Sequence, residues 1–179
     1  MSDVFEILKK DHQEVEAMLA QLVAGSADAS KISEKLVMDE SRHEAAEEMY
    51  FWPSVKDKVP GGEQLAEVAL RQEDEGKKVL DQLRKAEARS PEFNQLVAKF
   101  ASAGRAHIAY EETEVWPKLE AVLSAAERKD LGDKIDMAKR AGPTRPHPGA
   151  PDNPEALKTV GAATALADKV ADKVTGRGD

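Results

Sequence analysis

Apolar residues recur every three or four positions through four long stretches of the chain, a spacing that places them on one face of a helix. The stretches span residues 3–22, 30–53, 63–88 and 90–119. Short breaks rich in glycine, proline or small polar residues separate them, so successive helices would run antiparallel. The pattern predicts an all-α protein built as an up-down-up-down four-helix bundle.

Local signals place several helix ends. Ser90-Pro91 supplies an N-cap followed by a proline that suits the first helical turn. Pro53 is expected to kink or end the second helix, because proline cannot donate the backbone hydrogen bond of a helix interior. Ser124 and Glu127 have the spacing of a capping box. They predict a fifth, shorter helix that ends near Gly142.

The composition changes after residue 142. Five of the nine prolines fall in residues 143–154, which predicts a stiff linker. An amphipathic segment follows and is expected to pack on the bundle or on another subunit; its apolar positions are Leu157, Val160, Leu166, Val170 and Val174. The predicted division is therefore a helical bundle over residues 1–142 and a linker with an amphipathic tail over residues 143–179.

One motif occurs in both the second and the fourth helix. His43 and His107 are each followed by a glutamate at the fourth position and by Trp-Pro at the ninth and tenth. Residues four apart stack on one helical face, so each copy presents an imidazole and a carboxylate together. His12 and Glu73 occupy equivalent positions on the apolar faces of the first and third predicted helices. Each is followed by small or apolar residues at the same sequence offsets.

Six polar residues thus fall on apolar helix faces: His12, His43, Glu47, Glu73, His107 and Glu111. Buried charges are costly unless they are paired or bind metal. Facing helices that each carry a His and a Glu could hold a dinuclear metal site, with Glu47 and Glu111 bridging the ions. Nitrogen and oxygen donors without sulfur suit iron or manganese better than zinc in such a site. A metal-free bundle would leave the carboxylates without partners.

Composition narrows the function classes. The net charge is −8 and no basic stripe stands out, which argues against a nucleic-acid partner. The chain has no cysteine, so disulfides, iron–sulfur clusters and thiol catalysis are excluded. Neither a secretory signal nor an apolar run of membrane-spanning length is evident. We expect a cytoplasmic protein, a monomer or weak homodimer, without a membrane partner.

The order His12, His43-x-x-x-Glu47, His107-x-x-x-Glu111, with Trp-Pro closing each half, resembles the hemerythrin-like (HHE cation-binding) family of bacterial type over residues 1–125. The resemblance implies a hemerythrin-like four-helix bundle around a non-haem, oxo- or hydroxo-bridged di-iron site, with manganese as the less favoured metal. It further implies that His12 and His43 bind one iron and His107 the other.

The third helix departs from the family pattern because it has no histidine. Its acidic candidates are Glu73, Asp74 and Glu75. Glu73 is favoured as the third-helix ligand because it lies on the apolar face of that helix, and Glu75 is the fallback. Some relatives use the glutamate directly after the second-helix histidine as an extra ligand, which makes Glu44 a further candidate here.

An anionic glutamate in place of a neutral histidine favours the oxidised metal and resembles carboxylate-rich bundle enzymes. The sequence therefore predicts a di-iron, catalase-like enzyme that disproportionates hydrogen peroxide in oxidative-stress defence. The alternative is reversible binding or sensing of O2 or NO; iron storage is neither supported nor excluded. Tyr50 and Tyr110, each three residues past a ligand candidate, are considered as proton carriers, as ligands, or as ordinary core residues.

Other polar and aromatic residues receive plainer interpretations. Glu48, Glu112 and Glu114 are expected to face solvent. The two Trp-Pro pairs are expected to close the bundle below the site. His147 lies in the Pro-rich linker and is not expected to bind metal.

Overall fold

The computed structural model describes residues 3–149 and 162–175, and every regular element in these ranges is helical. In chain order the elements are α1 (Val4–Val23), α2 (Ala29–Ala46), the π-helix η1 (Glu47–Phe51), α3 (Trp52–Lys58), α4 (Gly62–Leu83), α5 (Pro91–Tyr110), the π-helix η2 (Glu111–Val115), α6 (Trp116–Glu120), α7 (Ala125–Ala141) and α9 (Ala162–Thr175).

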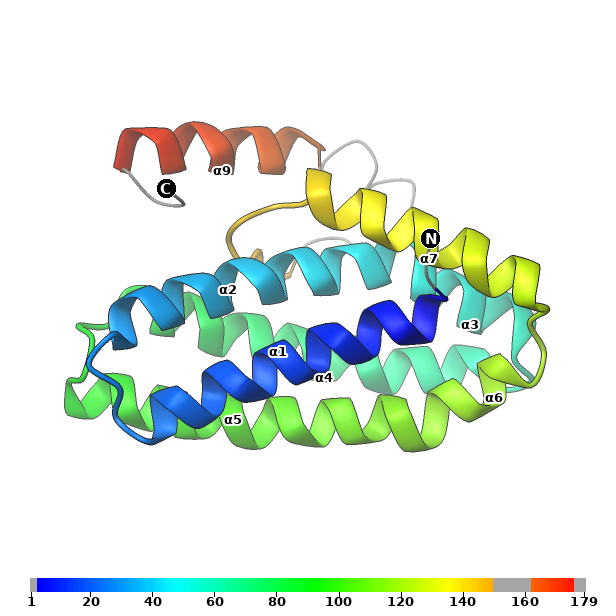
Figure 1. The fold of residues 1–179 in the computed structure, drawn as a ribbon, viewed down its shortest axis with the longest axis horizontal. Coiled ribbons are helices and arrows are strands. Elements are labelled where there is room, and N and C mark those ends of the chain that lie inside the picture. The colour runs from blue at the N-terminus through cyan, green and yellow to red at the C-terminus, as the bar shows by residue number, and fades with distance from the viewer. Residues whose placement is uncertain (1–2, 150–161, 176–179) are drawn as a thin grey trace.

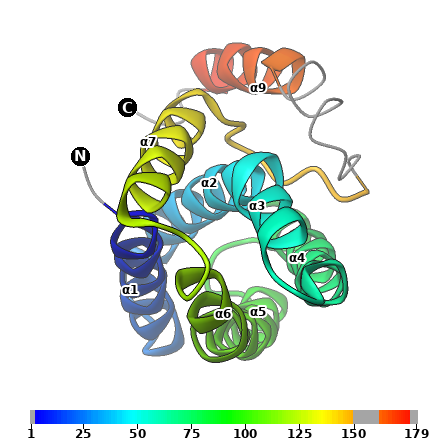
Figure 2. The same ribbon diagram turned by 90° about the vertical axis from the view of Figure 1, so that its right-hand side faces the viewer.

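Four antiparallel rods form the bundle (Figure 1). They are α1, the unit α2–η1–α3, α4, and the unit α5–η2–α6. Figure 2 shows the rods arranged around a common axis, with α7 lying against the α1 and α2 side. The predicted all-α bundle with a short extra helix is confirmed.

Two helix ends differ from the sequence expectation. The second rod does not stop at Pro53 but continues as α3 to Lys58, because a π turn precedes Pro53, which then occupies the first turn of α3. The third helix ends at Leu83, several residues early. Residues 84–90 instead form a turn in which Arg89 has φ 69° and Ser90 accepts a hydrogen bond from the Phe93 amide.

The core consists of two apolar clusters with a polar layer between them. One cluster includes Val4, Leu8, Phe51, Ala69 and Val115. The other includes Val15, Leu36, Val79, Phe100 and Ala101. On each rod the histidine and glutamate candidates lie between members of the two clusters. Apolar layers on both sides therefore screen the candidate site from solvent along the bundle axis.

The helix α9 lies outside the four-rod bundle (Figures 1 and 2). Asp168 and Asp172 are buried and bind the segment after α7, accepting hydrogen bonds from Thr144, Arg145 and His147. The apolar stripe of this helix is exposed, at Leu166, Val170 and Val174. Leu157 and Val160 lie outside the described residues. The boundary at residue 142 stays a prediction.

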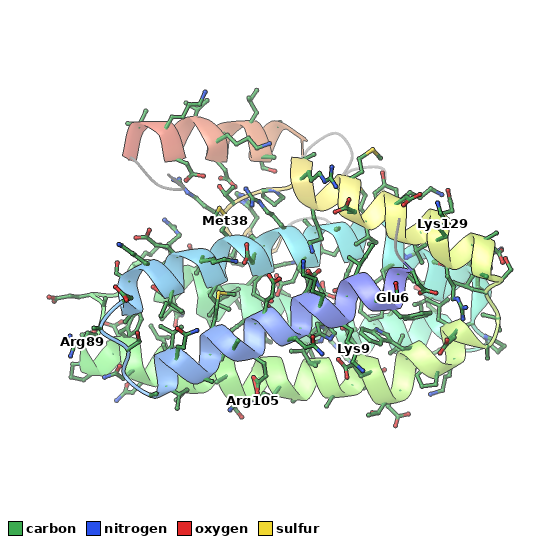
Figure 3. All side chains as sticks on the ribbon, in the orientation of Figure 1. Glu6, Lys9, Met38, Arg89, Arg105 and Lys129 are labelled. Atoms are coloured by element: carbon green, nitrogen blue, oxygen red, sulfur yellow. The ribbon has the colours of Figure 1, made fainter. Side chains whose placement is uncertain are left out.

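The bundle surface is polar. Figure 3 shows Arg105 projecting from α5, where its Nε lies 2.6 Å from Glu16 Oε1 of α1. Within the described ranges, no helix is both long and apolar enough to cross a membrane.

The close approach of α3 and α4 depends on Gly62. A Cβ at this position would lie 2.0 Å from the Val55 carbonyl oxygen. We expect Gly62→Ala to lower the free energy of unfolding by roughly 1–3 kcal/mol, because the backbone must shift to make room. Gly104→Ala is the matched control: its Cβ would meet only Phe100, at 3.8 Å. Urea denaturation should show this control at least as stable as the parent, and equal stability of the two variants would contradict the packing argument.

Candidate metal centre

Side chains from all four rods converge in the polar layer. Six residues form two groups that share two members. The first group is His12, His43, Glu47 and Glu111. The second group is Glu47, Glu73, His107 and Glu111. In each group one ligand-type atom per residue lies within 4.8 Å of all the others. The structure thus brings together all six residues that the helical stripes single out.

The two shared glutamates begin the two π-helices. Glu47 is the first residue of η1 and Glu111 the first of η2, and both side chains are fully buried. A π turn inserts an extra residue into the helix and often occurs at functional sites. In both rods Trp-Pro follows directly after the π turn. The repeated Pro, with no N–H to donate, is the sequence signal for this local change.

In each of the three imidazoles, Nδ1 forms a hydrogen bond with a side chain outside the cluster, and Nε2 faces the clustered carboxylates. The Nδ1 atoms lie near an acceptor: Glu112 Oε1 for His12 at 2.9 Å, Asp11 Oδ2 for His43 at 3.2 Å, and Gln72 Oε1 for His107 at 3.1 Å. These oxygens only accept, so Nδ1 carries the proton and donates. In a neutral imidazole the Nε2 lone pair is then free to bind a metal, an arrangement typical of metal-binding histidines.

The Nε2 atoms point at the carboxylates. His12 Nε2 lies 3.1 Å from Glu111 Oε2, and His107 Nε2 lies 3.2 Å from Glu111 Oε1. His43 Nε2 lies 3.2 Å from Glu47 Oε2. The two oxygens of Glu111 therefore face different groups.

Several of these buried atoms have no hydrogen-bond partner despite their closeness. They are His12 Nε2, His107 Nε2, both carboxylate oxygens of Glu47 and of Glu111, and Glu73 Oε2. Buried polar atoms are rarely left unsatisfied. Lone pairs that converge without hydrogen bonding one another fit metal cations placed between them, so the residues present suit a dinuclear metal site.

The pKa values of the clustered residues also reflect the cost of burying several carboxylates together. Burial raises the pKa of Glu47 and of Glu73 well above that of a free glutamate, and neighbouring carboxylates add to the effect. Burial acts the same way on Glu111, but His107 and His12 outweigh it and lower the pKa of that carboxyl. Burial disfavours charge on His107, yet Glu111 raises its pKa to about 9. In the absence of cations, burial and the neighbouring carboxylates therefore favour the neutral, protonated forms of Glu47 and Glu73.

The two tryptophans contact ligand candidates directly. The Trp52 indole N–H donates to Glu73 Oε1. The Trp116 ring stacks on His12, with ring centroids 5.2 Å apart and an interplanar angle of 18°. Both rings also pack in the apolar cluster beside the site. Beyond closing the bundle, they therefore orient a carboxylate and an imidazole, a role that the sequence pattern alone did not reveal.

Two glutamates that were expected to face solvent do not. Glu48 is buried and forms an ion pair with the buried Lys77 of α4. Glu112 is partly buried and accepts from His12 Nδ1. The expectation was wrong because polar side chains of neighbouring rods, Lys77 of α4 and His12 of α1, lie against these glutamates. Glu114, with 57% of its side chain exposed, does face solvent.

The remaining candidates take different positions. Glu44 is buried, its Oε2 has no hydrogen-bond partner, and burial raises its pKa to about 7. Glu75 has an exposed side chain paired with Lys78 on the outside of α4, so it does not join the cluster. Asp74 also lies outside the cluster and pairs with Lys78. His147 contacts Asp168 of α9.

Within the described residues, no hydrogen bond or ring contact joins Tyr50 or Tyr110 to the clustered histidines and glutamates. The Tyr110 hydroxyl donates to the Leu65 carbonyl oxygen at 3.2 Å. Tyr50 is half-buried and packs against the apolar cluster that holds the tryptophans. Their involvement in chemistry stays a prediction.

The sequence model of the hemerythrin HHE cation binding domain matches residues 3–119. The chain belongs to this family. The family resemblance drawn from the repeated motif is therefore confirmed. All the clustered histidines and glutamates lie inside the matched range, whereas α7 and α9 lie outside it.

The chain is also similar to individual proteins. An uncharacterized hemerythrin-like protein of Schizosaccharomyces pombe is 24% identical over 176 residues, covering 96% of this chain and 86% of that protein. A DNA nickase of Nostoc is 24% identical over 140 residues, which cover 76% of this chain but 39% of that protein. A crystal structure of a hemerythrin HHE cation binding domain-containing protein from Mycobacterium kansasii shares the fold, with a TM-score of 0.67, 18% identity and coverage of 94% of this chain and 99% of that one.

The raised pKa values predict how the metal-free protein responds to pH. A group whose pKa is raised on folding stabilises the fold below its unfolded pKa, and the stabilisation is lost as the pH rises through the folded pKa. His107, at about 9, and the raised Glu47 and Glu73 all act in this direction. We expect the free energy of unfolding to fall by on the order of 2 kcal/mol between pH 7 and 9.

Urea denaturation of chelator-treated protein across this range measures the effect. Protein reloaded with iron is the control and should show a flatter profile, because bound cations replace the protons. A constant or rising stability of the metal-free protein from pH 7 to 9 would contradict the described electrostatics.

Proposed function

We propose that the chain is a non-haem di-iron protein whose metal pair reacts with hydrogen peroxide. The observation that carries the proposal is that Glu47 and Glu111 belong to both ligand groups. A carboxylate offers two oxygens, and those of Glu111 face His12 on one side and His107 on the other. Glu47 and Glu111 would therefore help to hold both ions of a metal pair, one ion in each ligand group.

The other ligands divide between the two positions. His12 and His43 would bind one ion, and Glu73 and His107 the other. The donors are nitrogen and oxygen without sulfur, which suits iron, with manganese as the second choice. Glu44 is a candidate extra ligand because its buried Oε2 has no partner.

Glu73 supports peroxide chemistry over oxygen carriage. It adds a negative charge at a place where a histidine would be neutral, and three carboxylates around two ions favour the oxidised state. Two bound irons would supply a two-electron couple for the disproportionation of peroxide, 2 H2O2 → 2 H2O + O2.

The protein's own contribution is to hold the ligands in place. Asp11, Gln72 and Glu112 fix the imidazoles through Nδ1. The Trp52 indole fixes Glu73. The apolar clusters on both sides of the layer exclude bulk water, which strengthens the electrostatic interactions within it.

A small-molecule substrate is preferred over DNA, even though one relative is named a DNA nickase. The chain spans 39% of that protein and carries a net charge of −8, which opposes binding to a phosphate backbone.

An oxygen electrode tests the proposal. Peroxide is added to protein whose iron content has been measured, and O2 release is followed per chain. Sustained release is expected from the parent protein. Glu73→Ala should lower the rate by on the order of 100-fold or more, because loss of a direct ligand should exceed the loss of 10–100-fold seen for residues that only orient ligands.

Glu75→Ala is the matched control, since this glutamate lies on the same helix but is exposed and away from the cluster. It should retain the parent rate. Protein that carries two irons per chain and releases no O2 would overturn the peroxide reaction and leave reversible O2 or NO binding to be examined by anaerobic-to-aerobic spectroscopy. Equal loss in the two variants would contradict the assignment of Glu73.

A further inference from the structure

The helix α7 reaches the candidate metal centre through a chain of three side chains. Lys139 of α7 binds both carboxylate oxygens of Asp11 on α1. Asp11 Oδ2 lies 3.2 Å from His43 Nδ1. His43 Nε2 in turn lies 3.2 Å from Glu47 Oε2, inside the cluster.

This contact comes from outside the matched family domain, which ends at residue 119. The helix α7 is held firmly against the bundle. Ser124 and Glu127 form a complete capping box at its start, and Leu131 and Ile135 are buried in the apolar cluster next to the site. Lys139 lies one turn beyond Ile135, so the same packing that docks the helix also places the ammonium group over α1 and α2.

Asp11 differs from the acceptors of the other two imidazoles. His107 uses the neutral amide of Gln72, and His12 uses Glu112. Among these three acceptors in the described chain, Asp11 is the one that a cation from another helix also holds. Lys139 contacts both carboxylate oxygens of Asp11, and one of them, Oδ2, also faces His43 Nδ1.

A cleft of about 230 Å³ lies beside this chain of contacts, between α1, α2 and α7. Its lining includes Asp11, His43 and Lys139. The ion pair is partly exposed, with 23% of the Lys139 side chain and 15% of the Asp11 side chain accessible. Without the lysine, Asp11 would have room to turn toward the cleft and away from the imidazole.

We infer that Lys139 is a positioning residue for the metal centre. It holds Asp11 against His43 Nδ1, which keeps the proton on that nitrogen and directs the Nε2 lone pair toward Glu47. The extra helix therefore belongs to the working centre and tunes the position built from His12 and His43. The inference rests on the proposed dinuclear metal site.

Titration of metal-free protein with cobalt(II) tests it, since the visible spectrum of cobalt reports the ligands of each ion. Two ions should bind to the parent. Lys139→Met should weaken one of the two binding steps about 10-fold and change its visible band, as losses of outer partners of metal-bound histidines do, and leave the other step unchanged. Lys139→Arg should restore the band.

Lys134→Met is the matched control, because Lys134 is an exposed lysine of the same helix whose ion pair within the described residues is with Asp130 of that helix. It should titrate like the parent. If Lys139→Met fails to fold, Asp11→Asn serves instead and should show the same selective loss.

The outcomes separate the two proposals. Two bound ions with identical titrations for Lys139→Met and Lys134→Met would overturn the role of Lys139 and leave the dinuclear site standing. A parent protein that binds fewer than two cobalt ions would overturn the dinuclear site itself.

Discussion

The cost of burying carboxylates governs this structure. Glu47, Glu73 and Glu111 lie within one layer of a helical bundle and are almost fully buried. A buried carboxylate is tolerated when it is neutralised or bound to a cation. The facing imidazoles offset part of this charge, and they do so with Nε2 lone pairs aimed at the same space. The unpartnered oxygens of Glu47 and Glu111 are the remaining imbalance, and two metal ions would remove it.

The rest of the fold positions that layer. Each rod carries an apolar segment on both sides of its polar residues, so the layer is closed from both ends of the bundle. The shared glutamates are the first residues of the two π turns, which interrupt the second and fourth rods at the level of this layer. Hydrogen bonds from Trp52 and to Asp11, Gln72 and Glu112 then fix the ligand candidates from outside.

Much of this arrangement could be read from the sequence because it depends on helical periodicity. The His-x-x-x-Glu repeat places two residues on one face without reference to any distant part of the chain. The stripe register likewise separated Glu73 from the exposed Glu75. The repeat also predicted the family, which the domain match confirms.

The parts that were missed depend on departures from regular periodicity or on tertiary packing. Glu48 and Glu112 follow the shared glutamates in the π turns, where the 3.6-residue repeat no longer applies. Asp11 and Lys139 look like surface charges until α7 docks and brings them together. In α9, Asp168 and Asp172 face inward because they bind the 144–147 segment, so the apolar stripe does not mark the packed face.

The central claim is that the polar layer holds two ions bridged by Glu47 and Glu111. Anomalous X-ray diffraction at the iron absorption edge, on crystals of the iron-loaded protein, tests it most directly. The account predicts two peaks about 3.5–4 Å apart, as in other two-metal sites. One peak should contact His12 and His43, the other Glu73 and His107. A single peak, or peaks away from these glutamates, would contradict the account.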